Sequence, residues 1–237
     1  MKIRNPLLLN RPSQLILAYR PGTADDAVIG ENVLGKQYTA TQNLTKDDVW
    51  LDGGAHIGTF SVMIAPYVKR VIAVEPAQET YDLLMENVMR NGGNVETIKA
   101  AIVENDDLER DLYFPASYPY YNSAVSVVPV SGRFTRPTPC VNINDLIRDY
   151  GINKLKLDIE GVEATALLAI TDDLWAQITD LHYEWHFGLC GDLKRVKFYE
   201  MLEYLKSKGF YHMNPRVMKK QWFMTVHMSK TPPPVSE

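Results

Sequence analysis

The chain has 237 residues, 46% hydrophobic and 23% charged, a balance typical of a globular protein with a buried core rather than of a disordered or fibrous chain. Its net charge of −4 disfavours a protein whose main task is to hold nucleic acid, because phosphate binding needs a basic surface. No apolar run has the roughly eighteen residues of a membrane helix, and the two cysteines make neither a metal quartet nor a disulfide framework, so we expect a cytoplasmic protein with no membrane partner.

In the first half of the chain, short apolar runs alternate with amphipathic stretches. We expect a strand at 14–20 and then a helix at 24–34, with Thr23 as its N-cap. The elements expected next are a strand at 49–52, a helix at 57–68, a strand at 71–75, a helix at 77–91 and a strand at 95–102. This β-α-β-α-β order predicts a mainly parallel sheet with helices on both faces.

The second half begins with a loop-rich insertion at about 105–142, where the helical period disappears. The elements expected there and beyond are short strands at 111–114, 123–128 and 139–143, a helix at 146–150 starting at Asn144 or Asp145, a strand at 154–159, a helix at 162–170, a strand at 178–185, a helix at 194–207, and two closing strands at 210–213 and 221–228 joined by a turn around Pro215. We expect three parts: an N-terminal extension (1–46) packed on the core, a main domain (47–229) and a flexible tail (230–237).

The richest motif is a glycine turn between the strand at 49–52 and the helix that follows it. Glycines let the backbone approach a ligand, and the start of a helix offers free N–H groups. Two ligand chemistries fit the spacing, a loose dinucleotide fingerprint and the turn of S-adenosylmethionine enzymes. A tight turn without any ligand fits an isolated match about as well. The candidate cofactor-binding residues in this turn are Asp52, Gly53, Gly54, His56, Gly58 and Thr59.

Glu75 ends the next strand, roughly twenty residues beyond the turn, where a carboxylate can accept both ribose hydroxyls of an adenosine. The alternative is a solvated acid at a strand end. Because Glu75 follows an apolar strand whose carboxyl end faces the expected crevice, we favour ribose binding. The turn and the acid together predict a cofactor that carries adenosine.

A lysine and an aspartate interrupt the apolar strand expected at 154–159. Lys156 and Asp158 share one face of this strand, because alternate side chains do. Charged groups there cost free energy unless they are paired or line a site, so an internal ion pair is the alternative to a functional role. Ligands of parallel sheets bind at the carboxyl ends of strands, which favours the functional role. Glu163, which follows, is expected to cap a helix.

Five segments in this order resemble the FkbM-type family of S-adenosylmethionine-dependent methyltransferases: RPGTADDAVI (20–29), LDGGAHIGTFS (51–61), VEP (74–76), KAAIVEND (99–106) and LKLDIEGVE (155–163). The resemblance implies an α/β fold with a Rossmann-like, doubly wound sheet, mostly parallel with an antiparallel closing strand. It also implies S-adenosylmethionine as the cofactor and, as acceptor, a hydroxyl of a sugar, a polyketide or a similar small molecule.

The resemblance also assigns roles to individual residues. It places the glycine turn on the cofactor, Glu75 and the adjoining Pro76 at the ribose, Ala101 and Ile102 beside the adenine, and Asp158 near the methyl group. His56 departs from the glycine most common at its position, and its side chain is a candidate contact to the amino-acid end of the cofactor.

A further group of polar side chains, His182, Glu184 and His186, alternates along the strand expected at 178–185. If this strand neighbours Asp158, the group could supply a general base for a hydroxyl or part of a divalent-metal site, and we expect the base and no metal. The catalytic candidates are therefore Asp158, Glu184 and His186, with Lys156 as the weaker one. Other polar residues with a structural alternative are His212 and His227 in the closing strands, and Tyr118, Tyr120, Tyr121 and Asn122, which line either a substrate pocket or a packing ribbon.

These observations predict an S-adenosylmethionine-dependent O-methyltransferase acting on a sugar, a glycan or another small molecule. An NAD-linked oxidoreductase is the alternative enzyme, disfavoured because no second domain remains for its substrate. A non-catalytic module that binds an adenosine cofactor or associates with RNA is the other alternative. Basic clusters at 194–197 and 216–220 favour that module, whereas the net charge and the Lys156–Asp158 pair argue against nucleic acid as a partner.

Overall fold

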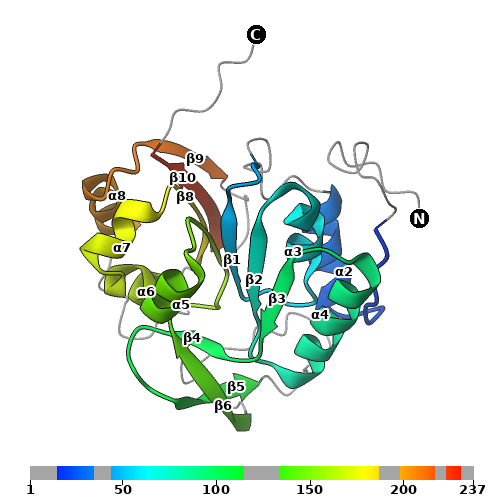
Figure 1. Ribbon diagram of the computed structural model, residues 1–237. Helices are drawn as coiled ribbons and strands as arrows, with labels where there is room; N and C mark the ends of the chain where they lie inside the picture. The colour runs from blue at the N-terminus through cyan, green and yellow to red at the C-terminus, as the bar shows by residue number, and fades with distance from the viewer. Residues whose placement is uncertain (1–14, 35–43, 115–133, 187–197, 217–222, 231–237) are drawn as a thin grey trace.

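The computed structural model describes residues 15–34, 44–114, 134–186, 198–216 and 223–230 (Figure 1). Its centre is a seven-stranded sheet in the order β3-β2-β1-β7-β8-β10-β9. The strands are β1 (Val49–Gly53), β2 (Arg70–Val74), β3 (Val95–Ile98), β7 (Lys154–Leu157), β8 (Asp180–His186), β9 (His212–Arg216) and β10 (Phe223–Ser229). Neighbours from β3 to β8 are parallel, whereas β10 is antiparallel to both β8 and β9. The expected doubly wound sheet with an antiparallel closing strand is confirmed.

Helices cover both faces of this sheet (Figure 1). On one side lie α2 (Ala24–Ile29), the π-helical η1 (Gly30–Leu34), α3 (Thr59–Ile64), the 3-10 turn η3 (Ala65–Tyr67) and α4 (Gln78–Asn91). On the other side lie α5 (Ile143–Tyr150), α6 (Glu163–Ala169), α7 (Asp172–Gln177) and α8 (Phe198–Ser207). Because both faces are covered, the central strands are apolar without alternation, and every residue of β1 is buried.

Neighbouring residues of β1 pack into different cores. Trp50 contacts Phe60 of α3 in an edge-to-face arrangement, with the ring centroids 5.5 Å apart. Leu51 belongs to the larger core, together with Leu155 of β7 and Leu181 of β8, beneath the helices of the other face. Successive side chains of a strand point to opposite faces, so β1 joins the two helical layers.

A second, three-stranded sheet carries part of the insertion. It contains β4 (Ala101–Val103), β6 (Phe134–Asn142) and β5 (Glu109–Phe114), in that order. The single strand expected at 95–102 is therefore wrong, because the chain leaves the edge of the large sheet after Ile98 and pairs Ala101 with Cys140 of β6. The strand expected at 123–128 lies outside the described residues.

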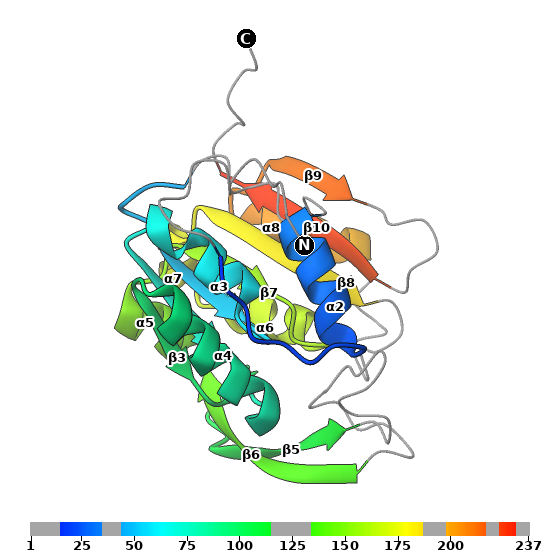
Figure 2. The same cartoon turned by 90° about the vertical axis from the view of Figure 1, so that its right-hand side faces the viewer.

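The strand expected at 14–20 is also wrong, because residues 15–20 have no regular secondary structure. Their backbone is bound by side-chain amides of α4 instead of by another strand. Asn91 accepts from the N–H of Ile16 at 3.0 Å and donates to its carbonyl at 2.7 Å. Asn87 does the same with Ala18, at 2.6 and 3.0 Å. Figure 2 shows this segment running alongside α4 to reach α2.

Three smaller differences concern a helix cap, an additional helix and a proline. Asn142, not Asn144 or Asp145, caps α5, since its side chain accepts from the N–H of Asn144. Helix α7 was not expected. Pro215 lies inside β9 opposite Val226 rather than in a turn. Proline has no backbone N–H to donate, and this is tolerated because β9 is an edge strand with only one neighbouring strand in the sheet.

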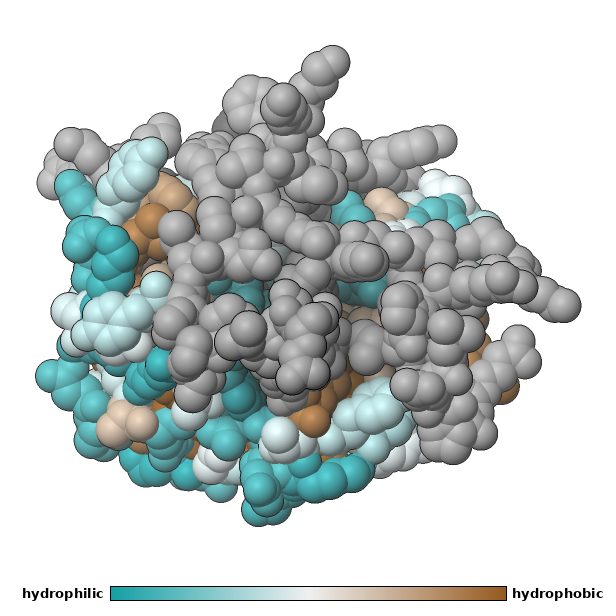
Figure 3. Space-filling view, turned by 90° about the horizontal axis from the view of Figure 1, so that it is seen from above, coloured by the Kyte–Doolittle hydropathy of each residue, from teal (hydrophilic) through white to brown (hydrophobic). Residues whose placement is uncertain are grey.

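None of the helices in the described part of the chain combines the length and the apolar character needed to span a bilayer. Figure 3 shows the face of the molecule that lies at the top of Figure 1. Its described part is largely hydrophilic, with smaller apolar areas among the hydrophilic ones.

Candidate functional site

The turn between β1 and α3 is held against the end of β7. Gly54 has a φ of +69°, and a Cβ there would lie 1.8 Å from the carbonyl oxygen of Asp158. Gly58 has a φ of +81°, and its Cβ would lie 2.5 Å from Cδ1 of Leu84 in α4. His56, between the two glycines, also adopts a left-handed φ of +53°. The sequence forms this turn because glycine alone fits two of its positions without steric conflict.

The side chain of Lys156, in β7, binds the turn and the end of β1. Its ammonium group lies 3.0 Å from Oδ1 of the fully buried Asp52 and donates to the carbonyl oxygens of Gly54 at 2.8 Å and Gly53 at 3.3 Å. The second oxygen of Asp52 accepts from the hydroxyl of Ser61 at 2.6 Å. Burial alone would lower the pKa of Lys156, but the negative charges of Asp52, Asp158 and Glu184 together outweigh it and the pKa is raised. Lys156 therefore stays cationic, which fits a positioning role better than that of a base.

Glu75 follows β2 and is buried beside the same turn. Its Oε2 accepts from the backbone N–H of His56 and its Oε1 from that of Ala77, each at 3.0 Å. Burial raises the pKa of Glu75 to about 7, although both hydrogen bonds oppose the shift. A carboxylate has about four lone-pair positions, so acceptor capacity remains for the two hydroxyls of a ribose.

The N-terminal helix contributes a contact that sequence reasoning missed. Asp25, in the first turn of α2, is fully buried and accepts three hydrogen bonds from Arg20, one from its backbone and two from its guanidinium. Nε2 of His56 lies 3.4 Å from the Oδ1 atom of Asp25. Burial would raise the pKa of Asp25, but the bonds from Arg20 prevail and lower it. An acid in the first turn of a helix resembles a simple dipole partner, so only the fold reveals its link to the glycine turn.

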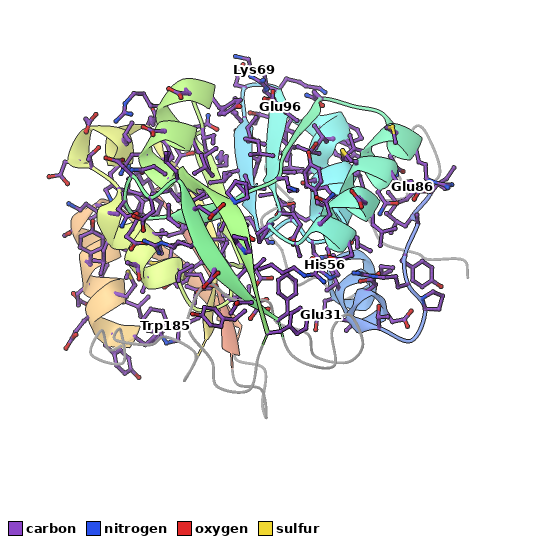
Figure 4. The ribbon with its side chains drawn as sticks, turned by 90° about the horizontal axis from the view of Figure 1, so that it is seen from below. Glu31, His56, Lys69, Glu86, Glu96 and Trp185 are labelled. Carbon is purple, nitrogen blue, oxygen red and sulfur yellow. The ribbon has the colours of Figure 1, made fainter. Side chains whose placement is uncertain are left out.

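Carboxylates gather at the carboxyl end of β7. Asp158 lies 4.0 Å from the Lys156 ammonium and its side chain is 28% exposed. Glu31, from η1, has a raised pKa because of burial and the charge of Asp158. Glu184 of β8 is buried, and its negative charge acts on Lys156. Figure 4 shows Glu31 and His56 in one region, away from Lys69, Glu86 and Glu96. The site is therefore electronegative.

The other expected site residues divide into four sets. Ile102 of β4 lies against Gly53, since a Cβ on that glycine would be 2.8 Å from Ile102 Cδ1. His186 ends β8, where only its backbone is described. Three more expected residues lie in the neighbouring elements: Ala101 in β4, Thr59 at the start of α3, and Pro76 between Glu75 and Ala77. Tyr118, Tyr120, Tyr121 and Asn122 lie outside the described residues.

His182 does not join the carboxylates, although it shares a strand face with Glu184. Its ring stacks on that of His227 with centroids 4.2 Å apart, and Trp50 lies on its other side at 5.6 Å. Glu163 does not cap α6 as expected, because Val162 is the N-cap and no described side chain caps the helix. Its carboxylate instead accepts from the N–H groups of Ile159 and Gly161, in the turn before the helix. In the part of the chain that is described, no three His, Cys, Asp or Glu side chains form a metal-binding group.

Two buried polar atoms of the turn lack hydrogen-bond partners in the described part of the chain, which bears on whether the turn fits a cofactor. Nδ1 of His56 and Oγ1 of Thr59 have no hydrogen-bond partner among the described residues. Buried polar atoms are normally satisfied, so each points to a ligand group that the turn would receive. Together with the remaining acceptor capacity of Glu75, they fit a cofactor that carries both hydroxyl and ammonium donors.

Comparison with known proteins agrees with this geometry. The sequence matches the family described as "Methyltransferase FkbM domain" over residues 52–211. No curated protein sequence matches the chain.

Several solved structures are similar to the chain. Methyltransferase FkbM from Methylobacillus flagellatus KT aligns with a TM-score of 0.54 and 14% identity, over 84% of this chain and 47% of that one. An rRNA methylase from Streptococcus thermophilus aligns with a TM-score of 0.49 and 11% identity, over 82% of this chain and 93% of that one. M. jannaschii TYW2 in complex with AdoMet aligns with a TM-score of 0.47 and 16% identity, over 90% of this chain and 77% of that one. At such low identities the likeness concerns the fold alone.

Proposed function

Because the chain belongs to the FkbM methyltransferase family, we propose that it methylates a hydroxyl oxygen of a sugar, a glycan or another small molecule. Family membership confirms two expectations from the sequence, methyltransferase activity and S-adenosylmethionine as the cofactor. The oxygen specificity and the acceptor class are the proposed part.

The proposed cofactor site consists of the glycine turn and its supports. Glu75 accepts the ribose hydroxyls, Ile102 lines the adenine side, and Lys156 fixes the turn by binding two of its carbonyl groups. When bound, S-adenosylmethionine supplies an electrophilic methyl group on a positively charged sulfur. The glycines matter because a side chain at position 54 would collide with Asp158 before any ligand arrived.

The observation that carries the proposal is the position of Asp158. Its backbone touches the glycine turn, while its partly exposed carboxylate lies beyond the end of β7, 4.0 Å from the Lys156 ammonium. From there Asp158 can take the proton of the acceptor's hydroxyl group. The acceptor's oxygen would bond to the methyl carbon as the carbon–sulfur bond breaks. Glu184 and His186 are the alternative bases, and Lys156 orients Asp158.

The negative charge at the carboxyl end of β7 supports a neutral acceptor. Asp158, Glu31 and Glu184 place negative charge there, and this repels a phosphate backbone. A sugar, whose hydroxyl groups donate hydrogen bonds, gains from the same carboxylates. Methylation of RNA, the activity that the name of the rRNA methylase describes, is therefore the competing outcome rather than the proposal.

The test is a screen with methyl-labelled cofactor against glycans, small hydroxylated compounds and total RNA, with the methylated atom identified by mass spectrometry. We expect label on oxygen of a small molecule, and label on an RNA base would overturn the proposal. On the acceptor found, Asp158→Asn should lower turnover about 10²–10⁴-fold while cofactor binding survives. Asp145→Asn, an exposed acid of α5 paired with Arg148, is the matched control. A chelator should change little.

We also propose that residues 47–229 form the catalytic domain, with 1–46 as an extension packed on it and 230–237 as a tail. The amide bonds of Asn87 and Asn91 to residues 16 and 18 support this division. Limited proteolysis should remove the tail first and leave residues 15–34 attached to the core.

A further inference from the structure

The part of the chain before the family match reaches into the glycine turn. The match begins at residue 52, whereas Asp25 belongs to α2. Asp25 is fully buried and its Oδ1 lies 3.4 Å from Nε2 of His56. His56 is also bound from the opposite side, because its backbone N–H donates to Glu75. One residue therefore links the proposed ribose acid to the N-terminal helix.

The hydrogen bonds around Asp25 decide where the proton of His56 resides. Both oxygens of Asp25 accept from Arg20, and an ionised carboxylate has no proton to donate. Nε2 of His56 must therefore be the donor in this contact. A neutral imidazole carries one proton, so Nδ1 is left as an acceptor. Burial lowers the pKa of His56 to about 4, which keeps the ring neutral near pH 7.

The acceptor atom Nδ1 is buried, and no described residue donates to it. On the proposed cofactor, Glu75 takes the ribose hydroxyls and the adenine lies toward Ile102, which leaves the α-ammonium as the free donor. A neutral ring can accept from an ammonium group, whereas a protonated one would repel it. Resting on the proposed function, we propose that Asp25 is a positioning residue for the cofactor: it holds His56 as the Nε2–H tautomer, so that Nδ1 accepts a hydrogen bond from the α-ammonium group.

The first experiment reads the tautomer directly in the cofactor-free protein. Nitrogen-15 labelling of the five histidines, with assignment through a His56→Gln variant, gives the protonation of each ring nitrogen of His56. We expect protonation at Nε2 alone at pH 7. Asp25→Asn should move the proton to Nδ1, because the new amide can donate to Nε2. Asp26→Asn is the matched control, since Asp26 is the next residue of α2 and accepts from the N–H of Gly22 instead. A proton on Nδ1 in the unaltered protein refutes the proposal, even if the Asp25 variant does not fold.

The second experiment asks whether Asp25 acts through His56 on the ammonium group. Calorimetry compares S-adenosylhomocysteine with its analogue lacking the amino group. Asp25→Asn should weaken S-adenosylhomocysteine roughly tenfold or more and leave the analogue within about twofold. In a His56→Ala background the same change should have little further effect. An equal loss for both ligands, or the same loss in both backgrounds, would mean that Asp25 only supports the fold. Failure of the unaltered protein to bind either ligand would instead reject the proposed function.

Discussion

Cofactor affinity should depend on pH through Glu75. The carboxyl group is buried beside the glycine turn, and its pKa is raised to about 7 in the free protein. Ribose hydroxyls would donate to the ionised form and therefore lower this pKa in the complex. The carboxylate binds better than the acid, so binding releases a proton and affinity increases as the pH rises through 7.

The magnitude follows from the fraction of Glu75 that is ionised before binding. With a pKa of about 7, roughly nine-tenths is ionised at pH 8 and roughly one-tenth at pH 6. If only the carboxylate binds, affinity falls about tenfold between these values, or about 1.4 kcal/mol. The pKa of His56, about 4, lies too low for that residue to contribute in this range.

Calorimetry at pH 6, 7 and 8, in buffers of different ionisation enthalpy, measures both the affinity and the protons released. Glu75→Gln should bind less tightly at every pH, because its amide NH₂ must face an N–H group of His56 or Ala77. Its profile should be flatter, and the difference from the unaltered protein removes any titration of the cofactor itself. Parallel profiles for the two proteins would remove Glu75 from the ribose site.

The remaining predictions concern the turn and the sheet. Gly54→Ala should abolish cofactor binding in calorimetry, because its Cβ would lie 1.8 Å from a carbonyl oxygen, whereas Gly22→Ala, with a similar φ but open space, should keep it. Lys156→Met should lower the free energy of unfolding in urea by roughly 3–5 kcal/mol, and adding Asp52→Asn should restore part of it by removing the unpaired buried charge. Burial depresses the pKa of His182 well below 6.5, so only the unfolded chain gains its proton as the pH falls below about 6.5. Stability should decline there, and the decline should be smaller in His182→Phe.

The central strands of the large sheet could be predicted because they are continuously apolar. Residues 49–52 and 71–75 needed no knowledge of distant partners, since burial on both faces dictates their composition. Residues 14–20 show the limit of that reasoning. Their apolar run suits a strand, but their hydrogen-bond partners are the side chains of Asn87 and Asn91, about seventy residues later, and no local pattern reveals them.

The site shows the same division. The turn, Glu75 and the Lys156–Asp158 pair are each defined by a local motif, so sequence reasoning proposed them together. Asp25 of α2 and Glu31 of η1 resemble ordinary first-turn acids, and only the fold brings their charges to His56 and Asp158. The RPGTADDAVI segment was the available signal, because its Asp25 stands in a stretch that resembles the family.

Asn87 gives the cofactor turn and the N-terminal segment a common anchor. Its fully buried amide exchanges two hydrogen bonds with Ala18 and also donates to the carbonyl of Ile57, within the turn, at 2.8 Å. A ligand that holds the turn in place must then hold Asn87, and with it the segment from Ile16 to Ala18. The backbone amide of Ala18 should accordingly exchange with deuterium more slowly when S-adenosylhomocysteine is bound, although no part of that ligand touches it.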